Sequence, residues 1–410
     1  MTNEQYILRN READIRTLAL KKTPEGVDPL WCLRQIEGYQ LAKKKLPEWA
    51  ATDGLWFPPR LSMEQCSSES TARYKQETVQ RLMQGQEPGV FVDLTGGFGV
   101  DFSYMARGFR TAVYVERQEE LCRTADHNMC LLGLDNVTTV NADSTAYVGS
   151  LDRADIIYAD PARRNTAGRK TVAIEDCTPD IGALQHKILA KSRYAIIKLS
   201  PMLDITQALR TLTNVREIHV VSVKGECKEL LCVLSASNDT AATTCHCVNL
   251  GTTDKPFSCV YGSNTAVSIL PPDTPLAGKL LFEPNASILK AGVQDAFAAE
   301  YRLSKLHPMS NLYVCDTEPQ AEDLSVRPPA RIFRIMETGD FSKSSLKTLL
   351  HGCGKGNITI RNFPSTVAEL RKRLRLKEGG DDYFFATTMQ SGRHVLIKCK
   401  TFINGKNINA

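Results

Sequence analysis

The stretch Val90–Ala106, which reads VFVDLTGGFGVDFSYMA, constrains the fold more strongly than any other part of the chain. A short apolar run ends in an acid, a glycine-rich turn follows, and an amphipathic segment begins after the last glycine. A strand, a tight turn and a helix in this order are typical of the first unit of a parallel sheet. Because glycine lets a backbone come close to a ligand, the turn predicts a binding site.

The alternation of apolar strands and amphipathic helices continues beyond this stretch. Strands are predicted at 90–93, 111–116, 136–141, 154–160 and 194–199, and helices at 101–107, 118–132 and 180–190. This order predicts a doubly wound α/β fold, in which helices cover both faces of a parallel sheet. Residues 216–235, REIHVVSVKGECKELLCVLS, contain two apolar runs around a Lys-Gly-Glu turn. They predict a hairpin that puts an antiparallel strand at the end of the sheet.

The chain has 410 residues, too many for one ordinary domain, and four regions are expected. They are a helical region at 1–80, the α/β core at 81–236, a small α/β insert at 237–325 with a helix at 286–300, and a basic α/β module at 326–410. The module holds 16 lysine and arginine residues against 6 aspartate and glutamate residues, whereas the whole chain has a net charge of +5. A basic module on an acidic body predicts an anionic partner.

Composition indicates the compartment. No apolar run has the length of a membrane span, and the first residues lack the apolar segment of a signal peptide. The 13 cysteines are odd in number and follow no disulfide framework, which is typical of a reducing compartment. We therefore expect a cytoplasmic protein with no membrane partner. Cys245-His246-Cys247 has no second ligand pair near it in the sequence, so no metal is expected.

Three kinds of ligand compete for the glycine turn. A Walker A loop needs Lys followed by Ser or Thr after its last glycine, but Val100-Asp101 stand there. A dinucleotide fingerprint needs a third glycine where this chain has Phe102, and the carboxylate of Asp93 would repel a pyrophosphate. S-adenosylmethionine (SAM) carries an amine and a sulfonium but no phosphate, so it suits the acid before the turn.

Further acids follow the next strands. Glu116 ends the second strand and can take both ribose hydroxyls. Asp143 follows the third strand and is placed to meet the adenine amine, while Ser68 either covers the methionine end of SAM or caps a helix. The predicted cofactor residues are Asp93, Thr95, Gly96, Gly97, Gly99, Glu116, Asp143, Ser144 and Ser68.

The segments VDLTGGFGVD, VYVER, VNADS and YADPARR, in this order over about 88–235, resemble the class I SAM-dependent methyltransferases. MEQCSSESTARYK before the core, LLFEPNASILKAG in the insert and the basic end resemble one subfamily. Its members carry a Rossmann-like methyltransferase core, a ferredoxin-like insert and a C-terminal THUMP-like domain. THUMP domains are RNA-binding modules, mostly of RNA-modifying enzymes, so the resemblance implies SAM as the cofactor and RNA as the partner.

Asp160-Pro161-Ala162-Arg163 follows the fourth predicted strand, at the edge where parallel sheets build their sites. The segment resembles the motif of amine-directed nucleic-acid methyltransferases, which has an acid or amide, two prolines and an aromatic residue. Here Ala162 replaces the second proline, and Arg163 stands where the aromatic residue would stack on a base. The predicted catalytic residues are Asp160, Pro161 and Arg163, and the alternative is a plain chain turn. Lys198 lines the same cleft or is solvated.

The basic module contains the segment TVAELRKRLRLK, in which Thr366 and Glu369 match a capping box. Val367, Leu370 and Leu374 are expected to form its apolar face. The predicted RNA-binding residues are Arg371, Lys372, Arg373, Arg375 and Lys377. The alternative is a solvated helix face.

These observations predict a SAM-dependent methyltransferase that acts on RNA, at a base, with an exocyclic amine as one candidate target. An RNA-binding protein with a catalytically silent SAM fold is the first alternative. A methyltransferase of a small molecule or a protein is the second.

Overall fold

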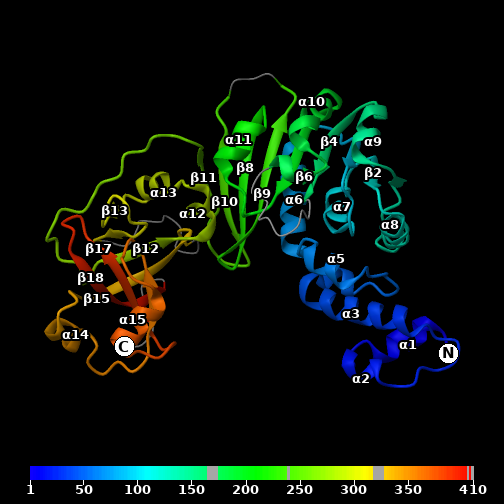
Figure 1. Cartoon of the computed structure of the whole chain (residues 1–410). Helices are drawn as coiled ribbons and strands as arrows, with labels where there is room; N and C mark the ends of the chain where they lie inside the picture. The colour runs from blue at the N-terminus through cyan, green and yellow to red at the C-terminus, as the bar shows by residue number, and fades with distance from the viewer. Residues whose placement is uncertain (164–173, 238–240, 317–326, 404–405, 408–410) are drawn as a thin grey trace. The chain divides into compact units, whose positions relative to one another are not determined.

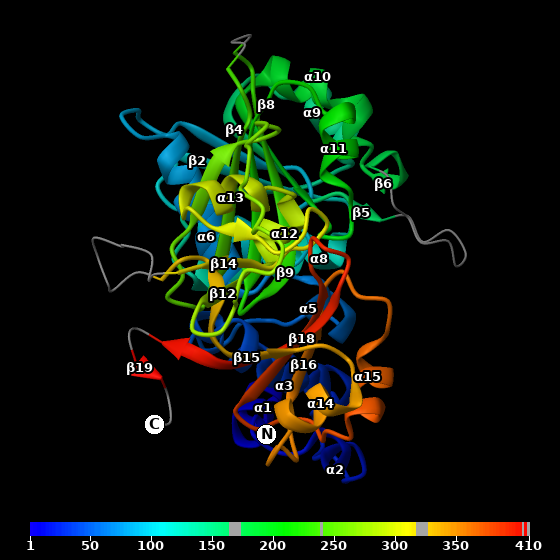
Figure 2. The same cartoon turned by 90° about the vertical axis from the view of Figure 1, so that its left-hand side faces the viewer.

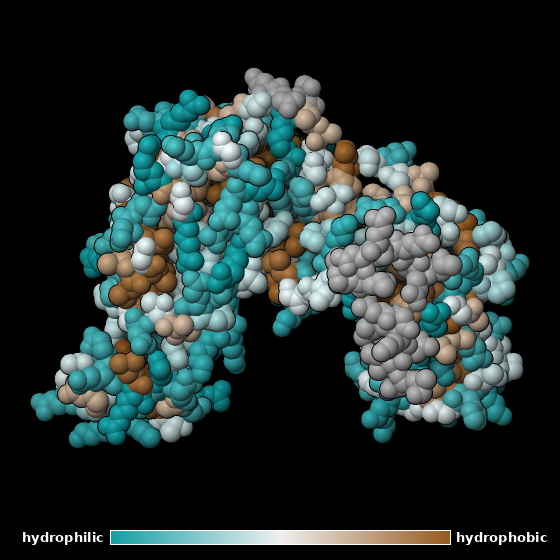
Figure 3. All heavy atoms as spheres, turned by 180° about the vertical axis from the view of Figure 1, so that it is seen from behind, coloured by the Kyte–Doolittle hydropathy of each residue, from teal (hydrophilic) through white to brown (hydrophobic). Residues whose placement is uncertain are grey.

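The computed structural model describes residues 1–163, 174–237, 241–316, 327–403 and 406–407. The chain divides into two compact units, Met1–Ile218 with Glu229–Ala241, and His219–Lys228 with Ala242–Ala410 (Figure 1). Among these described residues, no helix is long and apolar enough to cross a membrane. The face shown in Figure 3 is mainly hydrophilic, and its hydrophobic patches are separate from one another.

Helices dominate the first 82 residues, as the sequence predicts. They are α1 (Asn3–Asn10), α2 (Ile15–Ala19), α3 (Pro29–Lys45), α4 (Pro47–Ala50), α5 (Arg60–Gln65) and α6 (Glu69–Leu82). The longest of them, α3, begins with Pro29, and the Asp28 side chain accepts a hydrogen bond from the Trp31 amide at 3.0 Å. Pro and Asp are preferred at these positions because the first amides of a helix lack partners within it.

A large, mainly parallel sheet follows. Its strands are β1 (Val90–Asp93), β2 (Thr111–Glu116), β3 (Val137–Asn141), β4 (Ala154–Ala159), β7 (Ser192–Leu199), β8 (Val215–Val223), β9 (Glu226–Ser235), β10 (Thr244–Leu250) and β11 (Phe257–Val260). They lie in the order β3-β2-β1-β4-β7-β9-β8-β10-β11. β1 is parallel to β2 and β4, and β9 is antiparallel to β7. The predicted α/β class and terminal hairpin are confirmed.

The strand order places a binding edge at the carboxyl ends of β1 and β4. From β1 the chain continues outward to β2 and β3, and it then returns to β4 on the other side of β1. Ligands of doubly wound sheets bind at the carboxyl ends of the strands on either side of such a reversal. The glycine turn after β1 and the Asp160 segment after β4 therefore lie at the same edge.

In the part of the chain that the structure describes, five α-helices connect these strands, and two of them were not predicted. They are α7 (Val100–Met105), α8 (Glu119–Leu131), α9 (Ser144–Ser150), α10 (Ile181–Lys191) and α11 (Ile205–Thr211). The prediction missed α9 and α11. In α9 only Val148 is buried, so its sequence lacks the repeated apolar positions that indicate a helix. Two short strands, β5 (Ala162–Arg163) and β6 (Cys177–Thr178), pair with each other after β4.

The second unit contains another sheet, in the order β13-β14-β12-β15-β18-β17-β16. Its strands are β12 (Leu280–Pro284), β13 (Ser304–Lys305), β14 (Tyr313–Cys315), β15 (Ala330–Gly339), β16 (Asn357–Ile360), β17 (Asp382–Thr388) and β18 (His394–Ile403), and β19 (Lys406–Asn407) pairs with β18. β12 to β14 lie within the predicted insert, yet β12 pairs with β15 of the basic module. Strands of both regions therefore form one sheet.

Helices α14 (Lys343–Leu349) and α15 (Val367–Leu374) cover one face of this sheet (Figures 1 and 2). Leu370 and Leu374 of α15 pack with Phe384 of β17, while the next residue, Phe385, belongs to the core on the other face. This alternation is the ordinary pleat of a strand.

The predicted helix at 286–300 is wrong as a single helix. It consists of α12 (Ala286–Ala291) and α13 (Gln294–Glu300). Gly292 separates them with a φ of 72°, a left-handed conformation that ends a helix.

Candidate active site

The glycine turn after β1 is closely packed. A Cβ atom on Gly96 would lie 2.2 Å from the ring of Tyr114, so a larger residue would displace that buried ring. Gly99 has a φ of 84°, and a Cβ there would lie 2.6 Å from Met129. The Tyr114 hydroxyl also donates to the carbonyl of Gly97. The turn is thus supported by Tyr114 of β2 and Met129 of α8, and it needs glycine at both positions.

Asp93 ends β1 beneath this turn. It is 1% exposed, and its Oδ1 accepts a hydrogen bond from the Thr95 amide at 2.8 Å. Burial raises the pKa of the Asp93 carboxyl well above its ordinary value. A cationic ligand beside it would offset that cost, so the site suits the ammonium of an amino acid.

Thr95 ties the two strand ends together. The Asp160 amide donates to Thr95 Oγ1 at 2.6 Å, and Thr95 Oγ1 lies 3.3 Å from Asp93 Oδ1. The structure therefore brings Asp93, Thr95 and Asp160 together. The sequence predicted only that Asp93 and Asp160 lie at the ends of strands of the same sheet.

Glu116 ends β2 next to the turn. Its two carboxylate oxygens accept from the Gly97 amide at 3.0 Å and from the Gln118 amide at 2.9 Å. A carboxylate has about four lone-pair positions, so two remain for further donors such as a pair of hydroxyls. The arrangement fits a ribose, and the two amides hold the carboxylate in a fixed orientation.

The remaining predicted cofactor residues have local roles. Asp143 caps α9 by accepting from the Thr145 amide at 2.9 Å, and Ser144 Oγ donates to the carbonyl of Leu94 at 2.6 Å. Ser68 caps α6 by accepting from the Thr71 amide at 3.3 Å, and a helix cap is one of the two alternatives predicted for it. Asp143 and Ser144 lie after β3, at the same edge as Glu116.

Asp160 and Pro161 follow β4 directly, and Pro161 is buried. The backbone of Arg163 lies in β5, opposite Cys177 of β6, but its side chain lies outside the described residues, so its predicted stacking role has no structural account.

The sequence left the role of Lys198 open. In the structure its Nζ donates to Asp160 Oδ2 at 2.6 Å and lies 3.5 Å from Asp101 Oδ2. The Lys198 side chain is 12% exposed, against 41% for Asp160. Burial alone would lower the pKa of Lys198, but Asp160 and Asp101 raise it above its ordinary value. Lys198 is therefore a largely enclosed cation that holds one oxygen of Asp160.

A buried charge cluster continues behind this pair. Lys75 of α6 is fully buried, and its Nζ lies 2.6 Å from Glu229 and 3.2 Å from Asp101. Ser67 and Tyr158 donate to Asp101 at 2.7 Å and 2.8 Å. Burial would raise the pKa of Asp101, but the two lysines lower it below its ordinary value. Sequence reasoning missed this cluster.

The predicted RNA-binding residues lie on α15 and the loop after it. The capping box of Thr366 and Glu369 is present, as predicted. The helix ends at Leu374, so the expectation that Arg375 and Lys377 lie on it is wrong, because Arg375 adopts a left-handed conformation with a φ of 54°. The apolar face expected at Val367, Leu370 and Leu374 is only partly present.

Val367 is 39% exposed, whereas Leu370 and Leu374 are buried with Leu376.

Two of the five cations contact their own domain. Arg371 donates to the carbonyl of Gly356 and Arg373 to that of Phe341, each at 3.2 Å. Lys372, Arg373, Arg375 and Lys377 are exposed.

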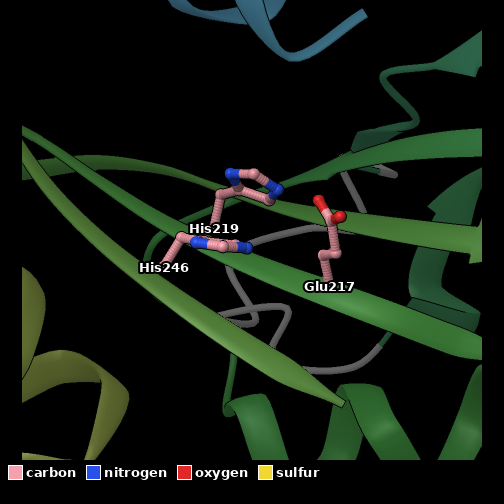
Figure 4. A group of neighbouring side chains, drawn as sticks. All are labelled: Glu217, His219 and His246. Carbon is pink, nitrogen blue, oxygen red and sulfur yellow. The ribbon is translucent and has the colours of Figure 1, made fainter. Parts of the chain in front are cut away.

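A separate group of side chains, Glu217, His219 and His246, has possible ligand atoms within 4.8 Å of one another (Figure 4). The Arg81 guanidinium donates to both oxygens of Glu217, with a distance of 2.8 Å to Oε1. His246 Nδ1 lies 2.8 Å from Ser258 Oγ. Because the arginine already compensates the carboxylate charge, we assign no metal to this group.

Comparisons with known proteins agree with this fold. Residues 330–401 match the family described as THUMP domain-like, and residues 280–321 match a ferredoxin-like domain. An uncharacterized S-adenosylmethionine-dependent methyltransferase of Mycobacterium tuberculosis strain H37Rv is 24% identical over 343 residues, which cover 82% of this chain and 86% of that protein.

A solved structure covers almost the whole chain. This crystal structure, of a "putative methyltransferase from Porphyromonas gingivalis W83", is 32% identical in sequence, with 97% of each chain covered and a TM-score of 0.83. The chain therefore belongs to the class I SAM-dependent methyltransferases, in the subfamily with a ferredoxin-like domain and a C-terminal THUMP-like domain.

Proposed function

We propose that this SAM-dependent methyltransferase modifies RNA. The observation that carries the proposal is the combination, in one chain, of a methyltransferase core with a THUMP-like domain at 330–401. Within that domain the cations Lys372, Arg373 and Arg375 are exposed. Exposed cations of this kind suit contacts with the phosphates of a nucleic-acid backbone.

The cofactor residues are assigned as part of the same proposal. Asp93 would hold the amine of SAM, Glu116 the ribose hydroxyls and Asp143 the adenine amine, while Gly96 and Gly99 let the backbone approach the amino-acid end. The buried carboxyl of Asp93 and the tight packing against Gly96 support this assignment. When bound, SAM supplies a methyl group made electrophilic by the sulfonium.

Asp160 is proposed to act on the methyl acceptor. Lys198 Nζ donates to Asp160 Oδ2 at 2.6 Å, so Oδ1 is left to accept a hydrogen bond from an exocyclic amine. The Pro161 carbonyl would accept the second hydrogen of that amine. Holding both hydrogens directs the nitrogen toward the methyl group and stabilises the positive charge that develops on it.

The test is methyl transfer from radiolabelled SAM into total RNA isolated from cells that lack the gene. The proposal expects label in RNA with the wild-type protein and at least about a hundredfold less with Asp160→Ala, the usual scale for loss of one such group. Label that enters protein or small molecules but not RNA would contradict the RNA substrate.

A further inference from the structure

A pocket of about 720 Å³ lies at the opposite edge of the large sheet from Asp160. We call it the arginine pocket, because Arg81, Arg153, Arg193 and Arg216 line it together with Glu217, Tyr194 and two serines. Arg153 precedes β4, and Arg193 and Arg216 lie at the starts of β7 and β8. The pocket therefore lies at the amino ends of β4 and β7, two parallel strands whose carboxyl ends carry Asp160 and Lys198.

The two edges are well separated. Arg193 and Lys198 lie on the same strand, five positions apart, and a strand rises about 3.3 Å per residue, so they are roughly 17 Å apart along β7. The arginine pocket is thus not part of the site that holds Asp160.

The charge of the arginine pocket is unbalanced. Four guanidinium groups line it but only one carboxylate, that of Glu217. Arg81 donates hydrogen bonds to that carboxylate. Arg216 donates to the carbonyls of Ala241 and Ser237 at 3.0 Å and 3.1 Å, which fixes its orientation. Among the residues that the structure describes, no acid forms an ion pair with Arg153 or Arg193.

Like charges held together repel one another, and an anion in the pocket would relieve that repulsion. Arginine is also the side chain whose planar donors match phosphate in two-point hydrogen bonds. The hydroxyl groups of Ser235 and Ser237 add further polar atoms to the lining.

We propose that the arginine pocket binds phosphate groups, and that the backbone of an RNA strand supplies them. The source of the phosphate rests on the proposed RNA substrate, whereas the phosphate chemistry rests on the pocket alone. An RNA that binds there while its target base lies at Asp160 would span both edges of the methyltransferase unit.

The test compares two full-length double variants of equal charge. Arg153→Glu with Arg193→Glu changes two exposed arginines of the pocket, and Arg9→Glu with Arg16→Glu changes two exposed arginines on α1 and α2. Affinity for a single-stranded RNA oligonucleotide is measured by fluorescence anisotropy between about 50 and 200 mM salt. Thermal melting checks that both variants fold.

The proposal expects only the pocket variant to lose part of the salt dependence. Two phosphate contacts on a single strand contribute a slope of about 1.4, so over this salt range the wild type should lose about sevenfold more affinity than the pocket variant. Equal behaviour of the two variants toward RNA would overturn RNA as the phosphate source.

A second arm uses inorganic pyrophosphate, measured by calorimetry. Binding that the pocket variant loses and the control variant keeps would support the phosphate site even if RNA binding is unaffected. Equal affinities of wild type and pocket variant for both RNA and pyrophosphate would overturn the site itself. Neither readout involves methyl transfer, so failure of the proposed activity would not obscure the result.

Discussion

Replacing Lys198 with methionine tests how the active site is built. The substitution keeps much of the side-chain volume but removes the ammonium that donates to Asp160 Oδ2 at 2.6 Å. Asp101 keeps its other partners, because Lys75 lies 3.2 Å from it and Ser67 and Tyr158 donate to it. The change therefore falls on Asp160 and on Ser67 Oγ, to which Lys198 Nζ also donates at 3.1 Å.

The magnitude follows from burial and geometry. A hydrogen bond to a charged group contributes about 1.5–3 kcal/mol to stability, and the lower end applies here because the Asp160 side chain is 41% exposed. Turnover should also fall, by about tenfold to a hundredfold, because Asp160 loses the contact that fixes its orientation. SAM affinity should stay within about twofold, because Asp93 and Glu116 are unchanged.

Single-turnover methyl transfer to RNA at saturating SAM measures the effect. A double-mutant cycle with Asp160→Ala then separates a role through Asp160 from an independent one. If Lys198 acts by holding Asp160, its loss costs little once Asp160 is already alanine. Equal losses of turnover in the presence and absence of the Asp160 side chain would refute the reasoning.

Three further predictions concern the rest of the molecule. Asp93→Ala should weaken SAM binding by at least about tenfold in calorimetry, since it removes the buried carboxylate assigned to the amine; unchanged affinity would move the amine elsewhere. Reversing the charges of Arg373 and Arg375 together should weaken binding to many RNA sequences alike and reduce its salt dependence; an unchanged salt slope would give the THUMP-like domain another role. Lys75→Met should lower the free energy of unfolding, measured in urea, by about 3–5 kcal/mol, because it leaves buried carboxylates uncompensated. The exposed control Lys43→Met should cost less than about 1 kcal/mol. Similar losses in both variants would refute the buried ion pair.

The pH dependence of stability follows from Asp101. Its pKa is lower in the folded protein than its ordinary value of 3.8, so the folded state gains stability above that value. Stability should therefore decrease as the pH falls below about 4, when the unfolded chain binds the proton more readily. Urea unfolding at several acidic pH values measures this, and the Lys75→Met variant should show a weaker dependence.

Local patterns predicted much of the fold. The apolar run before Asp93, the glycine turn and the acid of Glu116 indicated a first βα unit and its neighbour, because strand and turn preferences act over a few residues. The capping box at Thr366 was readable for the same reason.

The charge cluster behind Asp160 could not be predicted in this way. Lys75 and Glu229 are 154 positions apart in the chain, and only the fold brings them together. Their residue types gave no warning, since a lysine or a glutamate is usually exposed. The break at Gly292 was missed because the residues on either side of it continue an apolar pattern at helical spacing.

The proposal that this enzyme methylates RNA is tested most directly by mass spectrometry of RNA nucleosides from three strains. These carry the wild-type gene, no gene, or the gene with Asp160→Ala. We predict one methylated nucleoside that is present with the wild type and absent or strongly reduced in both other strains. Identical nucleoside profiles in all three strains would contradict the claim.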